Sequence, residues 1–342
     1  MKVSILKKSL NKALQIVLPL FLGIIIFAWT YHDFDFNRVW KVVTGEMDYG
    51  WMLFSLVFGV MGHVFRGWRW CLSLEPLGEK TTNANSIYAV FVAYAVNLVI
   101  PRIGEASRCG VLKKYDGVSF SKSLGTVVME RIIDSGCIFL ITVFTLVLQS
   151  HIFARFFKTT GTDVSVFSGL FTSTNFYISL LCIVSLFVLL YYLIKNLSMF
   201  TRVKVVLNNV WQGCVALKYM KHRTLFTFYT ICIWVCYFFQ FYVAFYCFDF
   251  SSHLDLMPGL VLFVVGSIAV AVPTPNGAGP WHFAVITMMM MYGVSKDDAG
   301  IFALLVHGIQ TFLLILLGIY GWIALPIVNR NRKPSAEGIA GR

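Results

Sequence analysis

Nine long apolar runs joined by polar connections constrain the fold of this chain more than any other feature of its sequence. A membrane-spanning helix needs roughly 18 to 20 apolar residues, and several of the runs reach that length. Only 13% of the residues are charged, about half the share typical of soluble domains. We therefore predict an all-α polytopic membrane protein. The runs are 13–30, 50–66, 84–100, 124–149, 176–194, 224–247, 256–272, 281–293 and 299–325.

The formal net charge of +12 is best explained by membrane topology, since Lys and Arg concentrate in cytoplasmic loops. If all nine runs crossed the membrane, some of the most basic connections would lie outside. If 84–100 instead turns back through 101–115, and 256–272 turns back through 281–293, then 22 of the 28 cations fall inside. The balance becomes +17 inside, −4 outside and −1 within the membrane. The basic excess then needs no nucleic-acid partner, and both termini are cytoplasmic.

This topology has six full spans and two oppositely oriented re-entrant hairpins, and it contains an internal symmetry. The order span, span, hairpin, span occurs in residues 1–150 and recurs, inverted, in residues 176–325, with an external loop at 151–175 and a cytoplasmic tail at 326–342. Such an inverted-topology repeat typically binds substrate at the midplane, between two interrupted helices. The alternative is a duplication symmetry that has no role in transport.

The first hairpin is interrupted at Asn97-Leu-Val-Ile-Pro101-Arg102-Ile-Gly104-Glu105-Ala-Ser-Arg108. Proline lacks an amide hydrogen and disfavours helix before it, so the helix should end near residue 100. Free backbone groups at such a break are tolerated only inside protein or beside a wet cavity. Arg102 and Arg108 are then placed to hold an anion, because a guanidinium can bind phosphate through two parallel donors. The alternative is that both arginines only mark a cytoplasmic loop.

The span that follows carries three charges near its start: Glu130, Arg131 and Asp134. Charges inside a membrane are costly unless they are paired. Arg131 and Asp134 can pair on one helical face, which leaves one carboxylate over. We expect that carboxylate either to be protonated or to pair with Arg102 or Arg108. The cluster would then either respond to an incoming lipid phosphate or brace the break permanently.

The second break is rich in proline and glycine, and it reads Pro273-Thr-Pro275-Asn-Gly277-Ala-Gly279-Pro280. These residues cannot form a continuous helix. A new half-helix should begin after Pro280, with free amides and a dipole that attract anions.

Arg66 and Arg69 lie in an aromatic and basic segment that we interpret as an interfacial girdle, with contact to lipid headgroups as the sharper alternative. The eight cysteines show no C-x-x-C pair and no metal-ligand spacing. No zinc-protease motif, Gly-rich phosphate loop or nucleophile elbow occurs in the sequence. We therefore expect no enzymatic activity, no metal and no cofactor.

Four motifs in this order resemble the lysylphosphatidylglycerol synthase transmembrane-region family of flippase-like membrane proteins. They are the Arg66 to Trp70 girdle, the Asn97 to Arg108 break, Glu130-Arg131-x-x-Asp134, and Pro273-Thr-Pro275-x-Gly277-x-Gly279. Members that make lysyl-lipid carry a soluble aminoacyl-transfer domain after the membrane region, whereas this chain has only 17 residues after Leu325. We therefore expect no lipid synthesis by it. The second break is also less glycine-rich than the family pattern.

The resemblance implies a translocator of a phospholipid or lipid-linked molecule. Its site residues would be Asn97, Arg102, Glu105, Arg108, Glu130, Arg131 and Asp134, and its helix breaks would be Pro101, Gly104, Pro273, Pro275, Gly277 and Gly279. We expect an anionic or zwitterionic phospholipid as partner, in the plasma (inner) membrane of a prokaryote, with a membrane-protein partner or homo-oligomer as a further option. The alternative function is a non-transporting scaffold for a lipid-modifying enzyme.

Overall fold

The computed structural model describes residues 21–152 except 33 and 101, then residues 208, 211, 212, 215–272 and 274–331. Every regular element within these residues is a helix. The α-helices are Phe21–Thr30, α2 (Phe36–Lys41), α3 (Tyr49–Leu74), α4 (Asn83–Val99), α5 (Gly104–Asp116), α6 (Phe120–Leu148), α11 (Arg223–Val243), α12 (Asp249–Ser252), α13 (Leu256–Ala269), α14 (Pro280–Met291) and α15 (Lys296–Val328). Shorter turns are η1 (Val42–Glu46), η2 (Glu75–Leu77), η3 (Ala216–Tyr219), η4 (Ala244–Cys247) and η5 (Pro275–Gly277).

Three described helices are long and apolar enough to cross a membrane: Phe120–Leu148, Arg223–Cys247 and Lys296–Val328. This confirms the prediction of an all-helical chain with membrane-spanning helices. The predicted span 176–194 and most of the loop 151–175 lie outside the described residues, as do residues 13–20 of the first span. The count of six spans stays a prediction.

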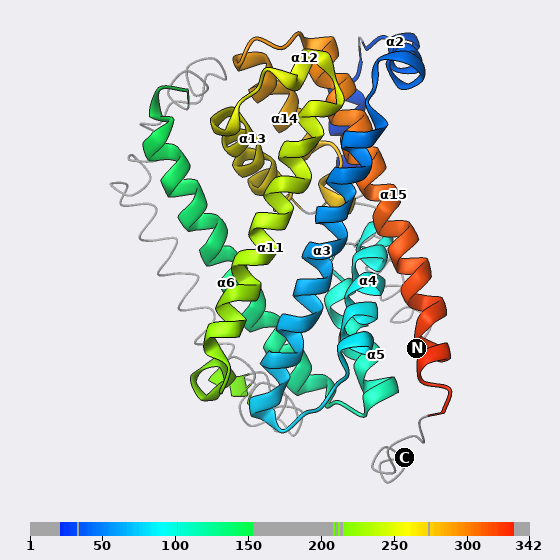
Figure 1. Ribbon diagram of the computed structural model, residues 1–342, viewed down its shortest axis with the longest axis vertical. Coiled ribbons are helices and arrows are strands. Elements are labelled where there is room, and N and C mark those ends of the chain that lie inside the picture. Colours follow the sequence, from blue (N-terminus) through cyan, green and yellow to red (C-terminus); the bar gives the residue numbers. More distant parts are fainter. Residues whose placement is uncertain are drawn as a thin grey trace, which may run out of the picture.

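Long helices run the length of the molecule, and two short hairpins occupy its opposite ends (Figure 1). Helix α3 packs along α11, and α15 packs along α4. The α4–α5 hairpin begins and ends at the end of the molecule where α3 and α15 finish, whereas the α13–α14 hairpin begins and ends at the other. The two hairpins therefore point toward each other from opposite ends of the molecule. The membrane boundaries that would make them re-entrant, and the inverted repeat itself, stay predictions.

Helix starts follow local sequence signals. The side chain of Asp48 accepts hydrogen bonds from the backbone amides of Gly50 and Trp51 at the start of α3. Thr82 caps α4 and Ser295 caps α15 in the same way. Each cap satisfies amides that the first helical turn leaves without a partner.

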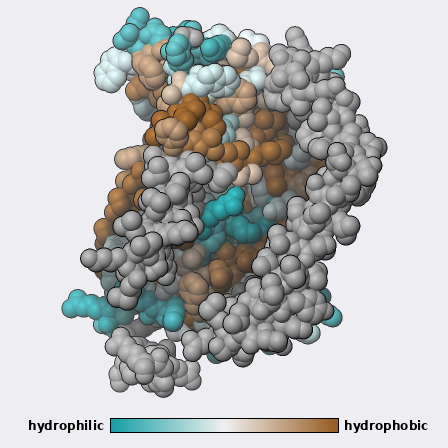
Figure 2. Space-filling model, turned by 180° about the vertical axis from the view of Figure 1, so that it is seen from behind, coloured by the Kyte–Doolittle hydropathy of each residue, from teal (hydrophilic) through white to brown (hydrophobic). Residues whose placement is uncertain are grey.

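Two separate apolar cores hold the two ends of the molecule. The first joins α3, α4, α5 and the start of α6 around Trp70, Leu74 and Leu112, which are fully buried. The second is larger and joins α11, α13, α14 and α15 around Phe245 and Phe302. Between the cores, at the middle of the molecule, lie the two helix breaks. Seen from the face opposite that of Figure 1, hydrophilic residues lie in a hollow at mid-height with hydrophobic residues above and below them (Figure 2).

Candidate functional site

The first break forms where predicted, and its turn is held by side chains of α4. Helix α4 ends at Val99, and Arg102 then adopts a left-handed backbone conformation with φ of 68°. The backbone N–H of Gly104 donates to Oδ1 of Asn97 at 2.7 Å, so Asn97 caps the start of α5 from the preceding helix. A Cβ on Gly104 would collide with the backbone carbonyl of Ala93. Pro101 lies outside the described residues.

Beside this break lies a buried ion cluster of Arg66 and Arg69 on α3, Arg108 on α5, and Glu130 and Asp134 on α6. Asp134 receives Nη1 of Arg66 at 2.7 Å and Nη1 of Arg69 at 2.9 Å. Glu130 receives Nη2 of Arg108 at 2.8 Å, and its other oxygen lies 3.4 Å from Nε of Arg69. None of the five side chains is more than 10% exposed. Removing one partner would leave a buried charge unpaired.

The ion pairs show how the three charges near the start of α6 are compensated. Arg131 lies 3.8 Å from Asp134, the pairing expected from their three-residue spacing. Glu130 pairs with Arg108 of the adjacent hairpin, which was one of the two alternatives. Arg131 also faces Glu105, with its Nε 3.9 Å from Oε1.

Arg66 and Arg69 differ from the expected girdle. Their side chains are 3% and 0% exposed, because both turn inward onto Asp134 instead of outward to the membrane surface. Arg69 is therefore enclosed by protein and does not face lipid. Arg66 lines the cavity described below, and its Nε also donates to the hydroxyl of Tyr237 at 3.2 Å.

The second break also forms where predicted, with Pro273 outside the described residues. Gly277 and Gly279 have φ of 73° and 90°, conformations that favour glycine. A Cβ on Gly279 would lie 2.7 Å from the carbonyl oxygen of Gly23, so the helix Phe21–Thr30 packs directly on this turn. Asn276 is left-handed with φ of 51°, and its side chain donates to Oγ1 of Thr311 at 2.8 Å. Pro275 opens the short turn η5.

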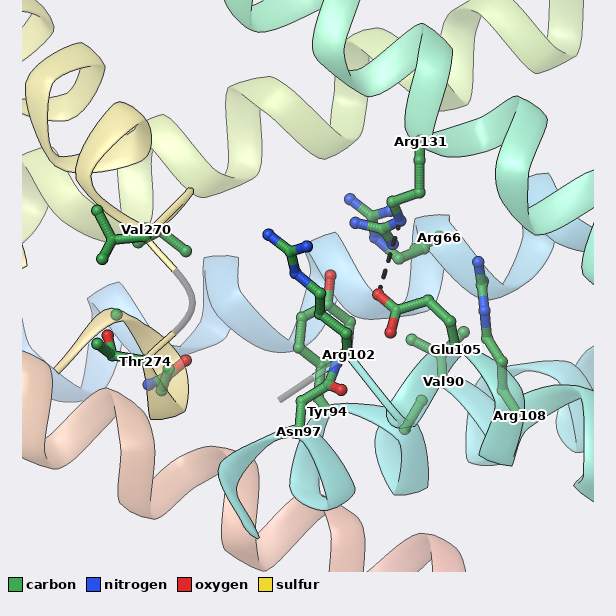
Figure 3. Close-up of a pocket in the computed structure, with 14 residues that line it drawn as sticks. Arg66, Val90, Tyr94, Asn97, Arg102, Glu105, Arg108, Arg131, Val270 and Thr274 are labelled. Atoms are coloured by element: carbon green, nitrogen blue, oxygen red, sulfur yellow. Dashed lines mark ion pairs between the residues drawn. The ribbon is translucent and has the colours of Figure 1, made fainter. Parts of the chain in front are cut away.

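The two breaks meet at a cavity of about 240 Å³, hereafter the break cavity. Arg102 lies between Val270 and Thr274 on one side and Arg66 and Arg131 on the other (Figure 3). Its guanidinium donates to the carbonyl oxygen of Ala271 at 3.4 Å, which links the two hairpins. The lining residues are Arg66, Val90, Ala93, Tyr94, Asn97, Arg102, Glu105, Arg108, Arg131, Val270, Val272, Thr274, Asn276 and Gly277.

The electrostatics of the break cavity favour an anion. Four guanidinium groups and one carboxylate, that of Glu105, face it. Nη1 of Arg108 is buried and has no hydrogen-bond partner among the described residues, and the same holds for Oε2 of Glu105. Buried polar atoms without partners are rare and costly in folded proteins. A phosphate group would satisfy Nη1 of Arg108, because it offers several acceptor oxygens.

Backbone strain concentrates at the same place. Arg102 and Asn276 are the two non-glycine residues with positive φ in the described part of the chain, and each belongs to a different break. Both line the break cavity. Such conformations cost about 1–3 kcal/mol and tend to cluster at functional sites.

Seven residues predicted from the sequence line the cavity, and Glu130 and Asp134 are ion-pair partners of its arginines, but the sequence did not indicate Tyr94 or Thr274. Tyr94 lies one helical turn before Asn97, on the same face of α4, and that spacing is a signal that could have found it. Thr274 is the polar residue between the two prolines of the second break, and its buried Oγ1 has no hydrogen-bond partner among the described residues.

Comparison with known proteins gives a single line of similarity. The family model described as the lysylphosphatidylglycerol synthase TM region matches residues 16–318. No curated protein and no solved structure matches the chain.

Proposed function

Because the chain belongs to the lysylphosphatidylglycerol synthase TM region family, we propose that it moves a phospholipid or a lipid-linked molecule between membrane leaflets. The headgroup phosphate binds in the break cavity, where Arg102 and Arg108 are its principal donors. The chain performs no chemical step on the lipid. It acts in the plasma membrane with both termini in the cytoplasm.

The observation that carries this proposal is the meeting of two helix breaks at a cavity lined by four arginines. Interrupted helices at the middle of a membrane protein are typical of transporter binding sites. Arginine suits phosphate because its planar group offers parallel donors and keeps its charge when desolvated. The wall from the second hairpin is neutral, so the positive charges opposite it have no competing carboxylate there.

Alternating access would follow from the two opposed hairpins acting as an inverted repeat. Among the described residues, one side-chain hydrogen bond joins the two breaks: the contact of the exposed Arg102 with Ala271, at 3.4 Å. A phosphate that takes Arg102 would release this contact and free one hairpin to move relative to the other. If the phosphate binds more tightly to the conformation without this contact, it shifts the equilibrium between two conformations of the helix bundle.

The test is lipid exchange by purified protein in proteoliposomes, measured by chemical quenching of a headgroup-labelled phospholipid in the outer leaflet. Arg102→Ala loses one charge-assisted hydrogen bond to the phosphate, so we expect this variant to exchange lipid about tenfold more slowly, or slower still. Lys113→Ala removes an exposed cation from α5 outside the cavity and serves as the matched control. Thermal unfolding in detergent checks that both variants are folded.

Unchanged exchange by folded Arg102→Ala would remove Arg102 from the mechanism. No exchange by the wild-type protein, together with specific capture of a lipid-modifying enzyme, would favour the scaffold function instead.

A further inference from the structure

Helices α5 and α6 leave an apolar groove of about 400 Å³ beside the break cavity, hereafter the side groove. Its apolar wall comes from α6, where Leu124, Val127, Val128 and Ile132 follow the spacing of one helical face. Val128 and Ile132 are 39% and 63% exposed. The groove therefore opens on the outer surface of the bundle, where the chain would face lipid.

Glu105 and Arg131 line both the side groove and the break cavity. They form the boundary between a charged compartment and an apolar one. A phospholipid has the same division between its phosphate and its acyl chains. The two spaces together therefore match the chemistry of one lipid molecule.

The contact between Glu105 and Arg131 is the weakest of the ion pairs around the cavity. Its closest atoms are 3.9 Å apart, and its side chains are 27% and 41% exposed. By contrast, Arg108 and Glu130 approach to 2.8 Å and are 2% and 0% exposed. The longer separation makes this the ion pair around the cavity that needs the least rearrangement to open.

We propose that the Glu105–Arg131 pair is a side gate through which a phospholipid enters, with its phosphate in the break cavity and one acyl chain in the side groove. This proposal rests on the proposed function and adds the route and the second binding site. The lipid phosphate takes the place of the Glu105 carboxylate beside Arg131. Arg131 keeps its second contact, with Asp134 at 3.8 Å. The five residues of the buried ion cluster stay in place during entry.

The experiment uses two photoactivatable probes with the same diazirine-bearing acyl chain, one a phosphatidylglycerol and the other a diacylglycerol without phosphate. The full chain is placed in nanodiscs, illuminated with each probe, and its adducts are mapped by mass spectrometry. The adduct yield at Leu124 and Val128 is divided by the adduct yield at Phe139 and Leu140. These two reference residues lie further along α6 and are 65% and 67% exposed. This ratio removes labelling by lipids that merely surround the bundle.

We expect the phosphatidylglycerol probe to give a ratio about tenfold above that of the diacylglycerol probe, the factor that one charge-assisted bond supplies. Arg131→Gln should lower this preference, because only Arg66, Arg102 and Arg108 then remain as arginines of the break cavity. Lys122→Gln removes a cation from the same helix outside both spaces and should preserve it. Equal ratios for the two probes in the wild-type protein would overturn the proposal.

A steric variant keeps the test independent of charge. Val128→Trp fills the side groove from a partly exposed position, so we expect loss of the Leu124 adduct and slower exchange, whereas Phe139→Trp leaves both unchanged. Exchange without phosphate-dependent labelling would reject the gate and keep the translocator. Phosphate-dependent labelling without exchange would keep the lipid site and reject translocation.

Discussion

The α4–α5 and α13–α14 hairpins turn at the same cavity but are held there by different interactions. Residues 83–116 contain six charged side chains, whereas residues 256–291 contain none. The first hairpin is fixed to α6 through Arg108 and Glu130 at 2.8 Å. The second is held by uncharged contacts: Asn276 donates to Thr311 at 2.8 Å, and the ring of Trp281 lies perpendicular to that of Phe241 at 6.1 Å between centroids.

This difference separates two tasks that one cavity must combine. The charged hairpin supplies the groups that attract an anion, and the neutral hairpin supplies a wall that does not hold it. Both hairpins store a strained non-glycine residue at the turn, Arg102 in one and Asn276 in the other. The shape of the break is thus shared, while the charge belongs to one side.

The largest effect should come from breaking the charged attachment. Glu130→Ala leaves Arg108 buried without its partner and removes one of the two carboxylates beside Arg69, so we expect a loss of about 3–5 kcal/mol in the free energy of unfolding. Hydrogen exchange measured by mass spectrometry should rise in α5 more than in α14. Glu46→Ala, at an exposed position, should change stability by less than about 0.5 kcal/mol. Equal loosening of both hairpins would contradict their separate attachment.

The parts of the fold that could be predicted from sequence are those with local causes. Proline and glycine clustered within a few residues disrupt a helix locally, so both breaks were found without tertiary information. Arg131 and Asp134 are three residues apart on one helix, and their contact follows from that spacing.

The inward turn of Arg66 and Arg69 could not be predicted in this way. Their common partner, Asp134, lies 68 and 65 residues further along the chain. The contact of Arg102 with Ala271 spans 169 residues. Basic residues at the end of an apolar run are typical of an interfacial anchor, and only the packing of α3 against α6 reverses that expectation.

The neutral hairpin should be most sensitive at its tightest turn. Gly279→Ala places a methyl group 2.7 Å from the carbonyl oxygen of Gly23 and strains a backbone with φ of 90°. We expect a loss of about 2–4 kcal/mol, the sum of the conformational and packing costs. Gly293→Ala shares the strain, with φ of 89°, but no described atom lies within 4 Å of its new methyl group. The difference between the two melting shifts isolates the packing cost, and equal shifts would show that the turn has room to relax.

A smaller effect is expected where the charged hairpin closes on itself. Gly104→Ala drives a methyl group into the carbonyl of Ala93 and the side chain of Asn97, so α4 and α5 must separate. We expect a loss of about 1–3 kcal/mol. Gly110→Ala, with no described atom within 4 Å, should instead stabilise α5 by up to about 1 kcal/mol through helix propensity. The test is whether Gly104→Ala lowers the melting temperature while Gly110→Ala raises it, measured by thermal unfolding.

The smallest effect, and the one that best separates structure from binding, lies at Asn97. Its Oδ1 accepts the Gly104 amide, so Asn97→Ala should cost about 1 kcal/mol and raise hydrogen exchange in the first turn of α5. Asn97→Asp keeps an acceptor at that position and adds a negative charge at a helix N-terminus, which the helix dipole favours. The same charge faces the break cavity, where it competes with an anionic headgroup for Arg102. We therefore expect Asn97→Asp to be as stable as the wild type but slower in lipid exchange. Normal exchange by that variant would show that the phosphate binds away from Asn97, nearer to Arg108 and Arg131.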